Sequence, residues 1–371
     1  MATRKEILWD LEEHSFGKHL VLKKYINAWF PILSKYNGRL LFIDGFAGPG
    51  EYKNGHIGSP LIALDAALHH RHEGVREQEI VFFFIENDKK RLDHLKSLIA
   101  SRYPNLPPNF KVHFAESKFD EAMTDLLNVI EEQKKRLAPC FAMIDPFGVS
   151  DTPMSIVHRI LENRQAEIYV SVMYEHINRF LGSREFRPHL NELFGDARWE
   201  KAKEIEDRYE KKEYLYRLYK SKLKASKANN AIHFELFKGN RHVYSIFFAT
   251  QSWVGTDKMK NAIWNIAPSG DFVFRGMAND GLDLASPDFV PLIEAIVSKF
   301  SDQWATPKQI AEFVGSDQTN YHSSQFKKNA LKVLEREGRL RVNPDDTHRR
   351  KRRFTYPDSV RFMITAGDKS A

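Results

Sequence analysis

The sequence predicts an α/β protein in which a doubly wound, mostly parallel sheet of seven strands is followed by a smaller helical unit with a basic hairpin. Between residues 40 and 173, apolar runs of strand length alternate with segments of helical periodicity, which is the order of a parallel sheet. The first run ends in a glycine-rich turn, which favours a ligand beyond the carboxyl ends of the strands.

The length of 371 residues suits one large and one small domain. We expect the first domain at residues 1–285, with a helical insertion at about 184–230, and the second at residues 286–371. The single cysteine, Cys140, excludes a disulfide within the chain and cysteine-rich metal sites, and is expected to be buried. No apolar run reaches the length of a signal peptide or a membrane span, so we expect a cytoplasmic protein.

The expected strands and helices follow one another in a regular order. Five parallel strands are expected at residues 40–43, 79–86, 110–117, 140–144 and 166–173. The helices around them are expected at residues 20–30, 60–71, 88–100, 119–137 and 154–163. Residues 232–237 and 242–250 are joined by a short polar turn containing glycine, which indicates an antiparallel hairpin that completes the sheet. A last helix is expected at residues 258–266, packed beside that hairpin.

The glycine-rich turn occupies residues 44–50, with sequence Asp-Gly-Phe-Ala-Gly-Pro-Gly. Three glycines allow a sharp turn and a close approach of the backbone to a ligand, although a plain tight turn has the same composition. The spacing differs from the dinucleotide fingerprint, and a phosphate-loop Gly-Lys-Ser/Thr is absent from the sequence. Ser59 is expected to cap the next helix, and Pro60 to occupy its first turn.

The segment from residue 198 to residue 228 is rich in Lys, Glu, Arg and Tyr. One interpretation is a solvated helix pair with tyrosines on its packing face. The other is an insert that contacts nucleic acid through basic and aromatic groups.

The C-terminal unit has three helical segments, at residues 289–300, 307–314 and 321–337. Two short strands are expected at residues 339–342 and 353–356, with a basic run between them. This order is typical of a winged helix-turn-helix. Between residues 339 and 356 there are seven Lys or Arg and two Asp, and such a local charge points to an anionic polymer as partner.

Part of the glycine-rich turn resembles the Asp-x-Phe-x-Gly-x-Gly signature of class I S-adenosylmethionine-dependent methyltransferases, which have a Rossmann-like sheet of this kind. The resemblance implies S-adenosylmethionine as the cofactor. It also implies that the methionine part of the cofactor contacts the turn, through Asp44, Phe46, Ala47, Gly48 and Gly50.

The same resemblance implies further cofactor contacts. Glu86 closes the second strand, where a carboxylate can bind both ribose hydroxyls, or can simply be a solvated charge. Glu116 and Ser117 end the third strand, where contacts to the adenine edge fall. Lys18 and His19 precede the first long helix, and some ribosomal RNA adenine methyltransferases have a comparable pair beside the cofactor; the alternative is a surface pair.

Asp145, Pro146 and Phe147 follow the fourth strand and form the candidate reaction centre. They resemble the Asn/Asp-Pro-Pro-Tyr/Phe motif of amino-methyltransferases, in which the first side chain accepts from the target amine and the ring stacks on a flipped base. This chain has one proline where that motif has two, which puts amine methylation in doubt. The alternative is a turn that only ends the strand.

Over about residues 15–270 the chain most resembles the bacterial three-Cys-motif partner protein family. The resemblance is carried by residues 42–50, 58–61, 144–148 and 259–264. It implies a partner protein with a three-cysteine motif, and a winged-helix tail of the kind that some members carry.

Two functions follow from these observations. The first is a methyltransferase acting on an RNA or DNA base. The second is a non-catalytic nucleic-acid-binding partner that keeps the fold. A phosphodiester enzyme is a third possibility, and the lack of an obvious paired metal-carboxylate motif counts against it.

The tail is the expected docking module for nucleic acid. We expect phosphate contacts from the wing cations Arg349, Arg350, Lys351, Arg352 and Arg353. Any sequence preference is expected from polar residues near the start of the last helix, namely Asn320, His322, Ser323 and Gln325. The alternative is a solubilising loop on a unit that contacts proteins.

Overall fold

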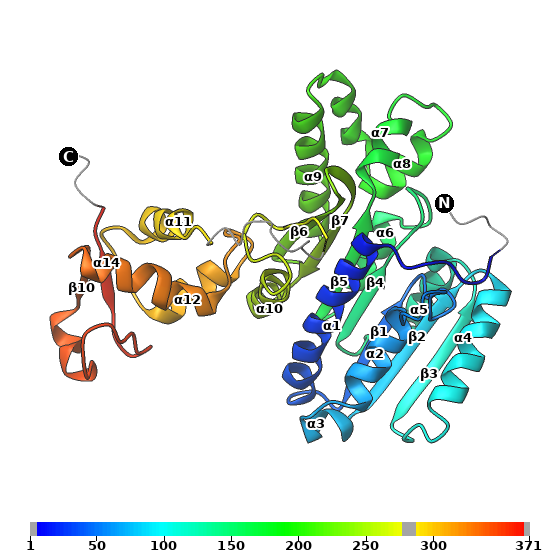
Figure 1. Cartoon of the computed structure of the whole chain (residues 1–371), viewed down its shortest axis with the longest axis horizontal. Helices are drawn as coiled ribbons and strands as arrows, with labels where there is room; N and C mark the ends of the chain where they lie inside the picture. The colour runs from blue at the N-terminus through cyan, green and yellow to red at the C-terminus, as the bar shows by residue number, and fades with distance from the viewer. Residues whose placement is uncertain (1–5, 277–286, 367–371) are drawn as a thin grey trace. The chain divides into compact units, whose positions relative to one another are not determined.

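The computed structural model describes residues 6–276 and 287–366 (Figure 1). It divides the chain into two compact units, Met1–Ser252 with Val273–Asp280, and Trp253–Phe272 with Gly281–Ala371. This division differs from the expected boundary near residue 285, because α10 (Trp253–Trp264) groups with the C-terminal residues. The side chains of Lys260 and Trp264 explain the difference, since they donate hydrogen bonds to the backbone carbonyls of Val314 and Asn320 at 2.7 Å each.

The first unit is built on an eight-stranded sheet of order β3-β2-β1-β4-β5-β7-β6-β8. Five strands are parallel: β1 (Arg39–Asp44), β2 (Glu79–Glu86), β3 (Phe110–Glu116), β4 (Cys140–Ile144) and β5 (Ala166–Val172). The hairpin of β6 (Asn230–Lys238) and β7 (Arg241–Thr250) follows, with β7 antiparallel to β5. The predicted count of seven strands omits β8 (Val273–Phe274), whose two residues pair with β6 and are too few to show a periodicity.

Helices cover both faces of this sheet (Figure 1). They are α1 (Glu13–Ser34), α2 (Ser59–Leu68), α3 (Glu73–Arg76), α4 (Lys89–Arg102), α5 (Phe119–Glu132) and α6 (Met154–Leu161). On the α1 face, the rings of Tyr25 and Trp29 pack against Phe141 of β4. On the other face, α5 and α6 bury aliphatic side chains against β1, β4 and β5. Gly58, and not the predicted Ser59, occupies the N-cap position of α2, and Ser59 is its first helical residue.

The insertion between β5 and β6 contains α7 (Tyr174–Phe180), α8 (Arg187–Phe194), the 3-10 helix η1 (Ala197–Glu204) and α9 (Arg208–Lys224). Tyr216 and Tyr219 of α9 are fully buried, together with Trp199 of η1, and form part of one core with α6 and β7. These tyrosines therefore lie on a packing face, as the first interpretation predicted, whereas Tyr209 is exposed.

The C-terminal unit contains α11 (Val290–Phe300), α12 (Pro307–Gly315), and one long helix made of α13 (Ser323–Phe326), the π-helical turn η2 (Lys327–Leu331) and α14 (Lys332–Arg336). The strands β9 (Trp304–Ala305), β10 (Leu340–Val342) and β11 (Phe362–Ile364) form an antiparallel sheet of order β10-β11-β9, and the 3-10 helix η3 (Pro344–Arg349) follows β10.

The predicted strand at residues 353–356 is wrong, because the second strand of the hairpin is β11. Phe354 has a φ of 60°, which lies outside the strand region of backbone space. The buried pair Phe362 and Ile364 instead supplies the alternating pattern that faces the core. The basic run still lies in the connection between the two strands. Within the described residues, no helix is both long and apolar enough to cross a membrane.

Candidate active site

Three carboxylates come together at the carboxyl ends of neighbouring parallel strands. Asp44 is the last residue of β1, Glu86 is the last residue of β2, and Asp145 directly follows β4. Strand β1 lies between β2 and β4 in the sheet. The sequence motifs had predicted this convergence, which is the usual position of a ligand in an open parallel sheet.

The glycine-rich turn is fastened to the end of β2. The amide of Ala47 donates to the carbonyl of Ile85 at 2.9 Å, and the amide of Gly48 donates to Glu86 Oε2 at 2.9 Å. Gly48 and Gly50 have φ angles of 60° and 84°, a region that glycine enters without strain. A Cβ at Gly50 would also lie 2.5 Å from Leu95 Cδ1 of α4. The turn is therefore a preformed backbone cradle.

Asp44 has an unused acceptor beneath this cradle. Its Oδ1 accepts from the amide of Phe46 at 3.2 Å. Its buried Oδ2 has no hydrogen-bond partner among the residues that the structure describes. Burial raises the pKa of Asp44 to about 7, although the Ser59 side chain and the Phe46 amide oppose the shift. A buried acceptor without a partner costs free energy, so this oxygen fits a ligand that brings a donor or a positive charge.

Glu86 is oriented from both sides. Its Oε1 accepts from the amide of Asp88 at 2.8 Å, while Oε2 accepts from Gly48. Burial raises the pKa of Glu86, and these hydrogen bonds together with the charge of Arg91 limit the rise. Each carboxylate oxygen keeps a second lone pair, so the side chain can accept from a pair of ligand hydroxyls.

The predicted adenine-edge residues lie next to this position in the sheet but face other partners. Glu116 is the register partner of Glu86 across β2 and β3. Its carboxylate is exposed and lies 3.8 Å from Lys89 Nζ. The Ser117 hydroxyl donates to Glu121 Oε2 at 3.1 Å. Their contact with a cofactor stays a prediction.

Lys18 and His19 are buried, at 4% and 5% exposure, and so they are not a surface pair. Lys18 Nζ donates to Asp145 Oδ2, and the Ser171 hydroxyl of β5 donates to Asp145 Oδ1. Burial alone would lower the pKa of Lys18, but the charge of Asp145 raises it well above the usual value. Burial alone would raise the pKa of Asp145, but Lys18 and Ser171 outweigh it, and the pKa falls below the usual value. The pair therefore stays ionised.

His19 lies beside this pair in its neutral form. Burial, assisted by the charge of Lys18, lowers the pKa of His19 to about 3. Its Nδ1 is buried without a hydrogen-bond partner among the described residues, and its ring centroid lies 5.7 Å from that of Tyr52. His19 thus offers a second polar atom that a ligand can satisfy.

Phe147 is exposed, at 68%, although the neighbouring Pro146 is buried. Its ring meets that of Trp9 edge to face, with 6.1 Å between centroids. Trp9 belongs to an N-terminal strap, residues 9–11, which is held by hydrogen bonds to Lys53 and Asn54 at 2.9 to 3.2 Å. Trp9 also lies 3.8 Å from a Cβ placed at Gly48. The strap therefore crosses the glycine-rich turn.

Four residues of this site were not predicted from the sequence: Trp9, Tyr52, Ser171 and Tyr244. Lys18 Nζ lies 5.6 Å from the ring centroid of Tyr244, which is buried on β7. The polar Ser171 near the end of the buried strand β5 was the one available signal, since buried polar side chains need a partner. The other three come from distant parts of the chain and carry no motif.

The predicted nucleic-acid residues of the C-terminal unit fall into different environments. Asn320 is exposed, but His322 is buried. Gln325 Oε1 accepts from the amide of His322 at 2.9 Å, and the hydroxyl of Ser323 donates to Asp257 at 3.0 Å. Three of the four polar residues therefore already have structural partners.

The five wing cations are also divided by their surroundings. Arg350 is 9% exposed and pairs with buried Glu335 at 2.6 Å, and Arg353 lies 3.6 Å from the same carboxylate. Arg349 lies 3.4 Å from Asp346. Lys351 and Arg352 are exposed and have no carboxylate within ion-pair distance among the described residues.

No family model matches this chain, and no curated protein matches it significantly. Among solved structures, a Legionella pneumophila protein aligns over 70% of this chain and 93% of its own, at 12% identity and a TM-score of 0.41. An S-adenosylmethionine-dependent methyltransferase from Agrobacterium tumefaciens aligns over 62% of each chain, at 9% identity and a TM-score of 0.35. A Bacillus cereus O-methyltransferase, in complex with SAH, aligns over 65% of this chain and 82% of its own, at 14% identity and a TM-score of 0.33. At these identities and TM-scores, the chemistry rests on the residues of this chain itself.

Proposed function

We propose that this protein is an S-adenosylmethionine-dependent methyltransferase that acts on a base of RNA or DNA. The observation that carries the proposal is the preformed turn at residues 44–50. It is tied to Glu86 at 2.9 Å and covers a buried Asp44 oxygen that has no partner among the described residues. The sheet order in which β7 is inserted antiparallel beside β5 supports the same class of fold.

The residues present fit this cofactor. The free oxygen of Asp44 would accept from the amino group of its methionine part, and the backbone of Gly48 leaves room for a close approach. Glu86 would accept from the ribose hydroxyls through its remaining lone pairs. When bound, S-adenosylmethionine supplies an electrophilic methyl group.

The chain's own residues would position the acceptor. Lys18 keeps Asp145 ionised, so its carboxylate accepts a hydrogen bond from a target amine and does not donate one. The exposed ring of Phe147 would stack on a base that has left its helix. Alignment of the acceptor with the methyl donor supplies much of the catalysis in such a displacement.

The same proposal includes a winged helix-turn-helix in the C-terminal unit and a partner protein with a three-cysteine motif. The order α11, β9, α12, long helix, β10 and β11 supports the winged-helix assignment. The partner protein is proposed from the sequence resemblance alone.

A non-catalytic nucleic-acid-binding protein is the second candidate. One observation favours it: both oxygens of Asp145 already accept from Lys18 and Ser171, and the motif has a single proline. The two candidates differ in turnover. A protein that binds the cofactor but transfers no methyl group to any RNA or DNA, with the partner present, supports the second.

Calorimetric titration with S-adenosylmethionine tests the first candidate. We expect micromolar-range binding that is weakened by Asp44→Ala and Glu86→Ala. Glu79→Ala is the matched control, because it removes a carboxylate from the opposite end of the same strand. If wild-type protein shows neither heat nor binding by a second method, the methyltransferase proposal is wrong.

A further inference from the structure

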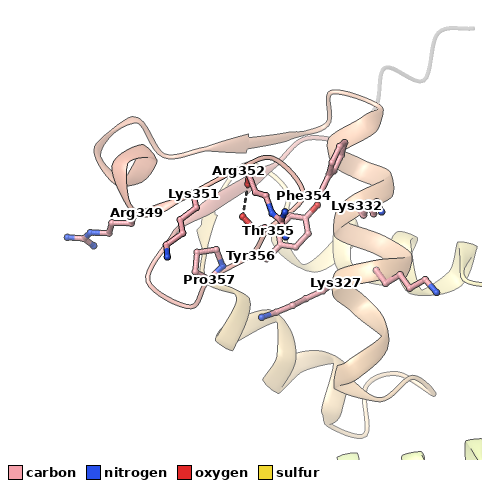
Figure 2. A pocket seen from close by; sticks show the side chains of 10 residues that line it. Lys327, Lys332, Arg349, Lys351, Arg352, Phe354, Thr355, Tyr356 and Pro357 are labelled. Atoms are coloured by element: carbon pink, nitrogen blue, oxygen red, sulfur yellow. Dashed lines mark hydrogen bonds between the residues drawn. The ribbon is translucent and has the colours of Figure 1, made fainter.

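A cationic hollow lies in the C-terminal unit, between the long helix and the β10–β11 connection. Figure 2 shows Lys327 and Lys332 projecting from the helix, and Lys351 and Arg352 from the connection. The hollow is open to solvent and has a volume of about 880 Å³. Six of its ten lining residues are Lys or Arg and none is acidic: Lys327, Lys328, Lys332, Arg349, Lys351 and Arg352.

The side of the hollow formed by the connection has a fixed shape. The guanidinium of Arg350 donates to both oxygens of Glu335, at 2.8 and 2.6 Å. The Tyr356 hydroxyl and the Phe354 amide donate to Glu335 as well, at 2.8 and 3.1 Å. Burial alone would raise the pKa of Glu335, but these partners lower it. Arg350 is therefore a positioning residue, which holds the connection against the helix.

The other cations of the hollow differ in counter-charge, and Arg349 lies 3.4 Å from Asp346. Lys327 lies 3.7 Å from the exposed carboxylate of Asp358. For Lys328, Lys351 and Arg352, no carboxylate lies within ion-pair distance among the residues that the structure describes. Exposed like charges on two sides of one hollow repel each other, and an anion seated between them relieves this repulsion.

The hollow offers no open aromatic face on which a base could stack, and few free polar side chains that could hydrogen-bond to base edges. The ring of Phe354 is 38% exposed, but Lys332, Arg336 and Arg353 lie 5.3 to 5.8 Å from its centroid. Tyr356 is buried. Proteins that hold single strands rely on open aromatic faces for stacking. Three of the four polar residues near the start of the long helix, His322, Ser323 and Gln325, already have partners within the fold. Contacts here are thus limited to phosphates.

We propose that this hollow seats the phosphodiester backbone of a double helix, and that its contacts are independent of sequence. The proposal rests on the nucleic-acid target of the proposed function and identifies how that target is held. Lys328, Lys351 and Arg352 make the contacts that release counterions, whereas Arg350 acts through the shape of the connection.

Fluorescence anisotropy with full-length protein tests this assignment. The probes are a labelled DNA duplex, an RNA duplex of the same sequence, the single strands, and a second duplex of scrambled sequence. The variant Lys328→Gln/Arg352→Gln removes one Lys and one Arg from the hollow. The control Lys299→Gln/Arg341→Gln removes the same charges from exposed positions of the same unit.

We expect the hollow variant to bind each of the three duplexes about tenfold more weakly, with a log–log salt slope smaller by about two. The control is expected to stay within about twofold of wild type. Equal losses in the two variants, or a loss confined to one sequence, would overturn the proposal. Tighter binding to single strands than to duplexes would overturn it also.

Two further outcomes separate this proposal from the proposed function. If wild-type protein binds the cofactor but none of the three duplexes, the hollow proposal is wrong and the methyltransferase proposal survives. Vesicles containing anionic lipid form the last arm. Binding to them that depends on Lys328 and Arg352, without duplex binding, would assign the hollow to a membrane surface instead.

Discussion

Charged side chains are buried and paired in the strand-end site of the first unit, but exposed and largely unpaired in the cationic hollow of the second unit. In the strand-end site, Lys18 is buried against Asp145, and burial keeps His19 neutral. In the hollow, Lys328, Lys351 and Arg352 stand in solvent with no acidic residue among its lining. Buried and paired charges are preorganised for a small ligand of defined shape. Exposed cations without counter-charge suit a polyanion whose bound counterions are released.

The largest expected effect comes from breaking the buried pair. Lys18→Met leaves the half-buried Asp145 carboxylate without its cation, and we expect the unfolding free energy to fall by about 3 kcal/mol, since only the Ser171 hydroxyl then stabilises its charge. Arg39→Met is the control, because its pair with Glu79 is solvent-exposed and is worth less than about 1 kcal/mol. Chemical denaturation measures both. Equal costs would show that Lys18 and Asp145 are not a preorganised unit.

The next largest loss of unfolding free energy is expected from a substitution in the glycine-rich turn. Gly50→Ala places a Cβ 2.5 Å from Leu95 at a φ of 84°, and we expect a cost of about 2–3 kcal/mol. Gly55 has nearly the same φ, 82°, but nothing within 4 Å of its Cβ position. Gly55→Ala should therefore cost only about 1 kcal/mol of backbone strain. If the two variants lose the same unfolding free energy, a Cβ at position 50 does not clash with Leu95.

The pH dependence of cofactor affinity sharpens the comparison further. The pKa of Asp44 is raised to about 7, so folding favours its protonated form. The raised pKa of Asp44 therefore contributes fully to the free energy of unfolding at pH values below the ordinary pKa of an aspartate. This contribution is lost as the pH rises through about 7. A ligand ammonium group favours the ionised form. An α-amino group of ordinary pKa begins to lose its charge at about pH 8, so affinity should rise about fivefold between about pH 6 and about pH 7.5.

Calorimetry at both pH values measures this rise, and Asp44→Asn should flatten it. A wild-type affinity that is independent of pH would mean that Asp44 is not the group that receives the ligand's charge.

The smallest effect tests the fixed shape of the hollow. Tyr356→Phe removes one of the hydrogen bonds to Glu335, and we expect a loss of about 1 kcal/mol in unfolding free energy. Duplex affinity should stay within about twofold, because Arg350 still holds the connection. Tyr209→Phe, on an exposed side chain, is the control. A loss of duplex affinity as large as that of the hollow variant would give Tyr356 a direct role in binding.

Local patterns predicted most of the sheet. Strands β2 and β4 begin and end where their apolar runs do, and the strand-end motifs located Asp44, Glu86 and Asp145. Features that depend on distant parts of the chain were not predictable in this way. The carbonyl of Trp9 accepts from the Lys53 amide, and the neighbouring Leu11 exchanges hydrogen bonds with Asn54. No local pattern encodes such contacts.

The C-terminal unit shows the same limit. Its helices followed from their periodicity, but the strand expected at residues 353–356 did not form, because Tyr356 is drawn to Glu335. The wing cations Arg350 and Arg353 are held by Glu335, a residue of the long helix, and Arg349 lies near Asp346. No local pattern in the basic run predicts these pairings.

The most direct measurement titrates S-adenosylmethionine and a nucleic-acid duplex separately into one protein preparation, at about 0.05 M and about 0.2 M salt. The account predicts that the cofactor binds at both salt concentrations with affinities within about twofold of each other, since its site is buried and locally paired. Duplex affinity should fall by an order of magnitude or more, because about three or more exposed cations exchange counterions for phosphates. Failure of the cofactor to bind, or an equal salt dependence for the two ligands, would contradict it.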